Sequence, residues 1–131
     1  MIAARVALLL SLSAAACAAS DADDLVVTNG TTLLVTLVVN GAPVRAVPPH
    51  SQETVPTRDL PPLPWNVETR TSSGRVLSAM TVRAGDVVVT SSYLRGDAVR
   101  VDLSCGRLDV ATGPPLVGPS RGPGTPGDCD P

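Results

Sequence analysis

Apolar and polar residues alternate with a period of two through most of residues 24–112. Valine is abundant in this region, and clusters of Gly, Asn, Ser and Pro separate the alternating runs. Because successive side chains of a strand point to opposite faces, the pattern predicts β-strands rather than helices. We count roughly seven or eight short strands, two of them near residues 24–28 and 86–91.

The segment TTLLVTLVVNGAPVRAV, residues 31–47, predicts the clearest hairpin. Asn40-Gly41 favours a type I′ turn, in which both central residues have positive φ. Pro43 donates no backbone hydrogen bond, so residues 42–47 are expected to form an edge strand. The turn predicts these cross-strand pairs: Val39 with Ala42, Leu37 with Val44, Val35 with Ala46, and, on the other face, Thr36 with Arg45.

The segment WNVETRTSSGRVLSAMTV, residues 65–82, predicts a second hairpin. A three-residue loop would shift its register by one position, and the alternation alone leaves both loops open. A two-residue turn at Ser73-Gly74 predicts these pairs: Val67 with Met80, and Trp65 with Val82.

The segment AVRVDLSCGRLDV, residues 98–110, predicts a third hairpin. Gly106-Arg107 suits a type II′ turn, which has glycine at its first central position, and this turn places Leu103 opposite Val110. Cys105 then lies at the inward rim of its strand, where the returning C-terminal segment can reach it.

Several short strands with frequent turns predict an all-β fold over residues 24–112. The expected architecture is a small antiparallel β-sandwich, Ig-like in the broad sense, with a small β-barrel as the alternative. Trp65 is the only Trp, and the chain has no Phe, so Trp65 is expected to anchor the core rather than to bind a ligand. The proline-rich segment LPPLPW, residues 60–65, is expected to cross between the sheets.

The N-terminus has the organisation of a secretory signal peptide, assigned to residues 1–16 and expected to be helical. Arg5 precedes the short apolar run VALLLSL, and small residues follow. Ala14-Ala15-Ala16-Cys17 resembles a bacterial lipobox, although its first position usually holds Leu. Cys17 is therefore a candidate lipid-attachment residue, with cleavage at an Ala-x-Ala site as the alternative. Residues 17–23 would then be a polar tether, and the protein a cell-envelope lipoprotein or a secreted protein.

Cys105 and Cys129 remain as a pair in an oxidising compartment, which predicts a disulfide. The closed loop of about 25 residues corresponds to roughly 3 kcal/mol in the chain-entropy model. Asp128 and Asp130 flank Cys129, and their negative charge disfavours a reactive thiolate. Residues 113–131 form a Gly/Pro-rich tail, which is expected to be disordered unless the disulfide fixes it.

The composition excludes some function classes. All ten basic residues are Arg, against twelve acidic residues, and the charges are scattered, so nucleic-acid binding is not expected. His50 is the only His and lies outside any nucleophile motif, which predicts no catalytic residue. No metal or cofactor site is expected: the chain lacks a C-x-x-C-H motif, and the acidic residues at 21, 23 and 24 do not have the spacing of a calcium loop.

Two short motifs match known recognition or modification signals but are not expected to act as such. Arg95-Gly96-Asp97 resembles an integrin-binding tripeptide, but such a triplet arises easily in a chain rich in these residue types. Asn29-Gly30-Thr31 is a glycosylation sequon, which a bacterial protein would usually leave unmodified.

Four segments carry a resemblance: TLVVNG, PPLPWNVETRTSSGRVL, RVDLSCGRLDV and the terminal GDCDP. They are similar to segments of short secreted proteins from GC-rich bacteria. The likeness covers most of the chain after the signal peptide, and it implies export. No motif in it names a chemistry, so no functional residue carries over.

These patterns lead to the expectation of a non-enzymatic cell-envelope or secreted module that binds a protein or surface partner, with an exposed sheet edge near Pro43 as the docking element. A membrane contact would arise only through a lipid at Cys17. The alternative is a small secreted inhibitor or hydrolase-like enzyme.

Overall fold

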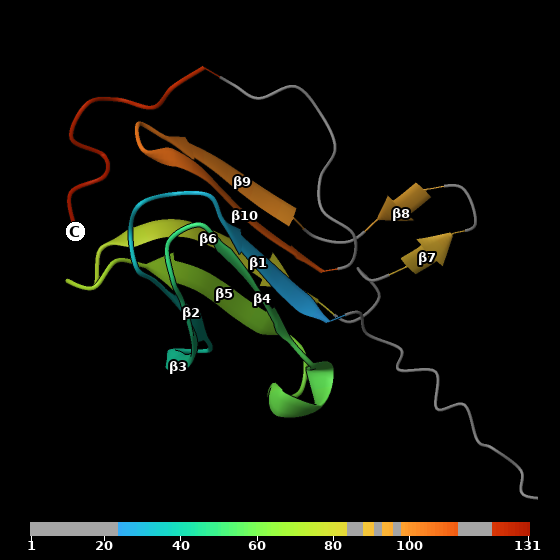
Figure 1. The fold of residues 1–131 in the computed structure, drawn as a ribbon. Coiled ribbons are helices and arrows are strands. Elements are labelled where there is room, and N and C mark those ends of the chain that lie inside the picture. Colours follow the sequence, from blue (N-terminus) through green and yellow to red (C-terminus); the bar gives the residue numbers. More distant parts are fainter. Residues whose placement is uncertain (1–23, 84–87, 91–92, 96–97, 113–121) are drawn as a thin grey trace, which may run out of the picture.

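The structure is a computed structural model that describes residues 24–83, 98–112 and 122–131, together with the backbone of residues 88–90 and 93–95. Two four-stranded antiparallel sheets pack on one another, in the orders β4–β1–β10–β9 and β3–β2–β5–β6, and β7 pairs with β8 (Figure 1). The predicted all-β sandwich is confirmed. Its strands are β1 Leu25–Asn29, β2 Val35–Val39, β3 Ala42–Val47, β4 Ser51–Val55, β5 Trp65–Arg70, β6 Val76–Val82, β7 Val88–Thr90, β8 Tyr93–Arg95, β9 Ala98–Leu103 and β10 Gly106–Thr112.

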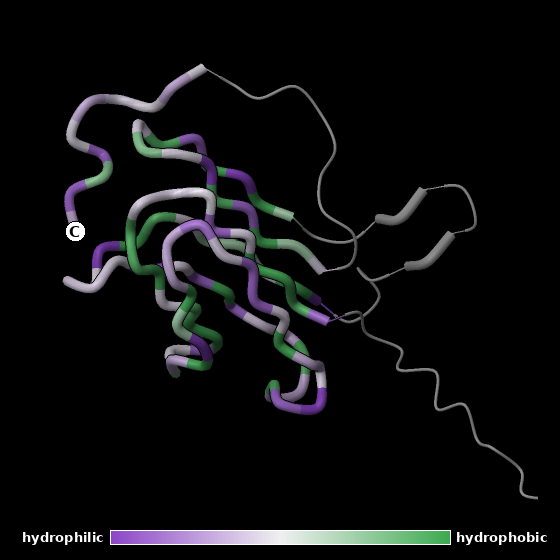
Figure 2. The backbone as a smooth tube through the Cα atoms, in the orientation of Figure 1, coloured by the Kyte–Doolittle hydropathy of each residue, from purple (hydrophilic) through white to green (hydrophobic). Residues whose placement is uncertain are grey.

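The core lies between the two sheets and consists of Val and Leu side chains around one large ring. Hydrophobic and hydrophilic positions alternate along the strands, so each sheet turns one face inward (Figure 2). Trp65 is only 1% exposed, and its indole Nε1 donates a hydrogen bond of 2.6 Å to the carbonyl oxygen of Pro61. The interpretation of Trp65 as a core residue is therefore confirmed.

The turn of the first hairpin is confirmed, but its predicted register is wrong beyond the first pair. Asn40 and Gly41 have φ values of 51° and 82°, as a type I′ turn requires. A β-bulge then follows on β3, because the pairing shifts by one residue between Leu37 and Val38. The pairs observed are Val39 with Ala42, Val38 with Pro43, Leu37 with Arg45, Thr36 with Ala46, and Val35 with Val47.

In the second hairpin the predicted pairs of Trp65 with Val82 and of Val67 with Met80 are confirmed. The loop has three residues, since the Thr71 N–H donates to the Arg75 carbonyl oxygen at 2.9 Å. A register shift next to Thr69 then restores the predicted pairing. The extra residue in the loop shifts the pairing register by one position, and the bulge on β6 shifts it back.

The third hairpin turns two residues earlier than predicted. Leu103 pairs with Gly106 rather than with Val110, so Ser104 and Cys105 are the central residues of the turn. Gly106 is the first residue of β10 and passes very close to Gly30: an added Cβ would lie 2.0 Å from the Gly30 carbonyl oxygen. Glycine is needed there for the close approach, with φ of 137°, and not for a type II′ turn.

Two strands were not predicted from the alternation. β4 directly follows His50, in a segment for which no strand is expected from the sequence, and β8 contains only three residues. Residues 56–64 connect β4 in one sheet to β5 in the other, as predicted for the proline-rich crossover. Among the described residues, no helix has the length and hydropathy that a membrane span needs.

Candidate functional site

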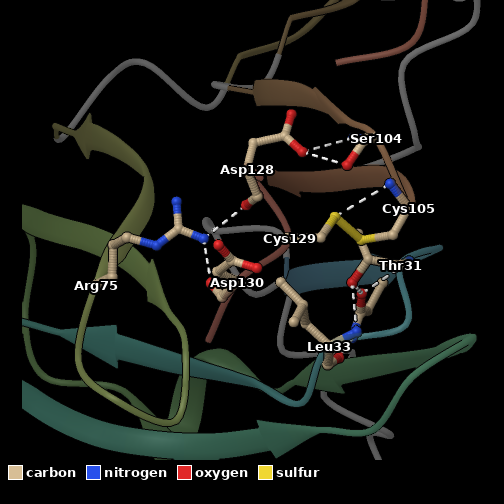
Figure 3. The surroundings of a disulfide bond; sticks show 9 residues. Thr31, Leu33, Arg75, Ser104, Cys105, Asp128, Cys129 and Asp130 are labelled. Carbon is tan, nitrogen blue, oxygen red and sulfur yellow. Dashed lines mark hydrogen bonds between the residues drawn. A yellow bond between two sulfur atoms is a disulfide. The ribbon is translucent and has the colours of Figure 1, made fainter. Parts of the chain in front are cut away.

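The best-defined polar cluster joins the C-terminal segment to one end of the sandwich. The predicted disulfide between Cys105 and Cys129 is present, with the Cα atoms 6.1 Å apart (Figure 3). The Cys105 N–H also points at the Cys129 sulfur, at 3.1 Å. Both cysteines pack against the core. Residues 122–131, here called the C-terminal clasp, are therefore fixed to the β9–β10 turn.

Asp128 adds a second attachment to the same turn. Its Oδ1 accepts hydrogen bonds from the Ser104 hydroxyl and from the Ser104 backbone N–H, the latter at 2.9 Å. These bonds stabilise the charged carboxylate, with the hydroxyl as the larger contribution, and they hold the pKa of Asp128 below its ordinary 3.8. The carboxylate thus serves as a hydrogen-bond acceptor for the β9–β10 turn.

Arg75 ties the clasp to the other sheet. Its guanidinium donates to the carbonyl oxygen of Asp128 at 2.6 Å and to that of Asp130 (Figure 3). Arg75 directly precedes β6, whereas the disulfide holds the β9–β10 turn, so the clasp connects both sheets. Sequence reasoning missed Arg75, because nothing in its local pattern distinguishes it from the other arginines.

Acid is expected to loosen the clasp. Because the folded pKa of Asp128 is lowered, its contribution is present above the ordinary value of 3.8 and is lost as the pH falls below it. Hydrogen exchange of the Ser104 amide should therefore accelerate in acid beyond its intrinsic pH dependence. Asp128→Asn should remove this dependence, while Asp130→Asn, which leaves the Ser104 bonds intact, should retain it. If acid accelerated exchange of the Ser104 amide equally in both variants, the assignment of the effect to Asp128 would be wrong.

The sequon residue Asn29 is buried, and its side chain holds together the backbone segments around it. Its Nδ2 donates to three carbonyl oxygens, those of Leu33 at 2.8 Å, Val47 at 3.1 Å and Pro48 at 3.1 Å. Its Oδ1 accepts from the N–H and the hydroxyl of Thr31, at 3.0 and 2.6 Å. With Asn29 1% exposed, the amide is not available for glycosylation.

The outer face of the β9–β10 pair carries two cross-strand ion pairs. The Arg100 Nε atom lies 2.8 Å from Asp109 Oδ1, and the Arg107 Nε atom lies 3.0 Å from Asp102 Oδ1. Each Arg is opposite an Asp in the register, and these pairs stabilise the sheet by matching charge across neighbouring strands. We assign them a structural role.

The only histidine and its neighbouring serine do not form a nucleophilic pair. His50 lies in an exposed turn with φ of 52°, and its backbone N–H donates to the Thr31 carbonyl oxygen at 3.2 Å. The Ser51 hydroxyl donates to the Pro48 carbonyl oxygen at 2.7 Å. Within the described residues, no three His, Cys, Asp or Glu side chains gather as a metal site would require.

Several predicted features lie outside the described residues. These are the signal peptide at residues 1–16, the tether with Cys17, and Gly96-Asp97 of the tripeptide. Asp24 is described, and its carboxylate accepts a hydrogen bond from the Thr57 N–H at 3.2 Å. Cys17 therefore remains a sequence-based prediction.

The edges of the two sheets are the other candidate for an interaction site. β3, predicted to be an edge strand, lies at one edge of its sheet, and β6 lies at the opposite edge. β3 contains Pro43 and Arg45, which disfavour pairing with a further strand, whereas β3 and β6 each contain a bulge. β6 has seven residues without a charge or a proline, and Ala79 and Thr81 on it are exposed.

Comparison with known proteins gives no relative from which a function can be transferred. No protein-family model, no curated protein and no solved structure matches the chain.

Proposed function

We propose that the protein is a non-enzymatic, exported binding module that pairs the outer edge of β6 with an extended segment of a partner. The observation that carries the proposal is the chemistry of this edge. No described strand pairs with it, and VLSAMTV contains no charge and no proline. An edge strand leaves backbone N–H and C=O groups unpaired, and a partner strand can satisfy them.

The other three edges are weaker candidates for the same role. On β3, Pro43 lacks a backbone donor and Arg45 carries a charge; a bulge is present on both β3 and β6 and does not distinguish them. β4 carries Glu53, and β9 carries Arg100 and Asp102, so an added strand would have to accommodate charge. This comparison moves the proposed docking edge from β3, where the sequence placed it, to β6.

The proposal includes export and the broad Ig-like class. A disulfide is typical of oxidising compartments outside the cytosol, and the N-terminal sequence has the pattern of a signal peptide. Lipidation at Cys17 would hold the module at a membrane surface. Two packed antiparallel sheets around the buried Trp65 support the Ig-like description.

Site-specific photo-cross-linking tests the proposal. A photoreactive residue at Ala79 of β6 should capture a partner in native envelopes, whereas the same residue at Ala46 of β3 should not; both positions are exposed. Ala79→Lys should reduce capture from a neighbouring β6 position, because a lysine on an edge opposes strand addition. Ala46→Lys is the matched control and should have no effect.

Capture at Ala46 instead of Ala79, or capture that Ala79→Lys leaves unchanged, would overturn the assignment to β6. The mass of the cross-linked product distinguishes a second copy of this chain from another protein. Far-UV circular dichroism of both lysine variants shows that the sandwich remains folded.

A further inference from the structure

The chain contains two Asn-Gly dipeptides in very different surroundings. Asn29-Gly30 lies at the end of β1, with Asn29 buried, and Asn40-Gly41 forms the exposed turn between β2 and β3. Asparagine followed by glycine is chemically labile, because glycine has no side chain to hinder attack by its nitrogen on the asparagine amide. The two sites share this chemistry, so the fold alone decides which of them reacts.

At Asn40-Gly41 the nucleophile, the Gly41 backbone nitrogen, is free to attack. The Gly41 N–H has no hydrogen-bond partner within the described part of the chain, and a Cβ added there would meet nothing within 4 Å. The carboxamide is also polarised: Asn40 Oδ1 accepts a hydrogen bond of 2.8 Å from the Asn66 N–H. A donor in this position stabilises the negative charge that develops on this oxygen during attack.

At Asn29-Gly30 the nucleophile, the Gly30 backbone nitrogen, is engaged in a hydrogen bond. The Gly30 N–H donates to the Arg107 carbonyl oxygen at 2.7 Å. The Asn29 carboxamide is held in place by donating to three carbonyl oxygens, and its burial excludes the water that would open a succinimide. Reaction at this site requires the surrounding structure to open first.

We infer that Asn40 is a site of spontaneous deamidation in the folded protein and that Asn29 is protected. The Gly41 nitrogen forms a bond to Asn40 Cγ, and the Nδ2 group leaves as ammonia with the proton that the Gly41 nitrogen gives up. The product is a five-membered succinimide. One water molecule then adds to either imide carbonyl and opens the ring, giving an aspartyl or an isoaspartyl residue at position 40.

Both products change the β2–β3 hairpin. The new carboxylate cannot donate the bond that Asn40 Nδ2 makes to the Pro64 carbonyl oxygen, at 3.3 Å. The isoaspartyl product also inserts one carbon into the backbone of a two-residue turn, whose geometry sets the pairing of Val39 with Ala42. Modification at this turn therefore adds negative charge and loosens the β3 edge of the sandwich.

Mass spectrometry after incubation at mildly alkaline pH tests the inference. Fragmentation of the peptides should localise the replacement of amide nitrogen by oxygen to Asn40, and should separate aspartyl from isoaspartyl forms. In the folded protein, Asn40 should convert at least about tenfold faster than Asn29, which reacts only through opening. In the chain unfolded by denaturant, the two rates should become similar.

Asn29 thus provides an internal control within each sample. Asn40→Gly should abolish the main conversion without disturbing the fold, because Gly-Gly also suits a type I′ turn. Equal rates at the two sites in folded protein would overturn the inference. So would an Asn40 that remains intact in folded protein while it converts in the unfolded chain.

Discussion

Trp65→Ala is expected to lower the free energy of unfolding by about 4 kcal/mol, which is a large fraction of the stability of a small domain. The side chain is 1% exposed and is the only aromatic ring among the core residues that the structure describes, so its removal leaves a cavity between the sheets. The variant also leaves the Pro61 carbonyl oxygen without its indole donor. Denaturant unfolding followed by far-UV circular dichroism measures the effect.

Trp65→Phe separates the two contributions. Phenylalanine retains most of the apolar volume but makes no hydrogen bond to Pro61, so a smaller loss, near 1–2 kcal/mol, is expected. If Trp65→Ala cost no more than Trp65→Phe, the ring would not be the anchor of the core.

Asn29→Asp is expected to lower the free energy of unfolding by about 4 kcal/mol at neutral pH. The two side chains have almost the same shape, but the introduced carboxylate would point at the carbonyl oxygens of Leu33, Val47 and Pro48 and donate to none of them. Burial and these oxygens would raise the pKa of the introduced carboxyl group. Part of the stability should therefore return as the pH is lowered through that raised value.

Asn66→Asp is the matched control for this charge. Asn66 is exposed, and its Oδ1 accepts a hydrogen bond from the Thr81 hydroxyl, which a carboxylate accepts equally well. A change within about 0.5 kcal/mol is expected. Similar losses in both variants would show that the charge itself, rather than the buried network around Asn29, determines the effect.

The sequence predicted those features of the fold that local backbone chemistry determines. Alternation identified most strands, and Asn40-Gly41 identified its turn because few residue pairs accept positive φ twice. The register beyond that turn was wrong, since a bulge has no marker in an alternating run other than the neighbouring Pro43. β4 was missed because SQETV carries only one apolar residue.

Close contacts between distant segments explain the other errors. Gly106 was assigned to a turn, whereas its small size serves the passage of β10 past Gly30, a residue far away in the sequence. The role of Asn29 had one local signal, since asparagine often accepts a bond from the N–H two residues on, here Thr31. Its three carbonyl acceptors depend on the folded chain, and so does the contact of Arg75 with the clasp.

The position of the disulfide determines how the sandwich would carry a mechanical load. β1 and β10 are antiparallel through five pairs, from Leu25 opposite Thr112 to Asn29 opposite Leu108. A pull between the start of β1 and Cys129 passes through the disulfide to Cys105, at the far end of this ladder, so all five pairs resist in shear. With the bond reduced, the same pull would enter at Thr112, beside Leu25, and would unzip the pairs one at a time.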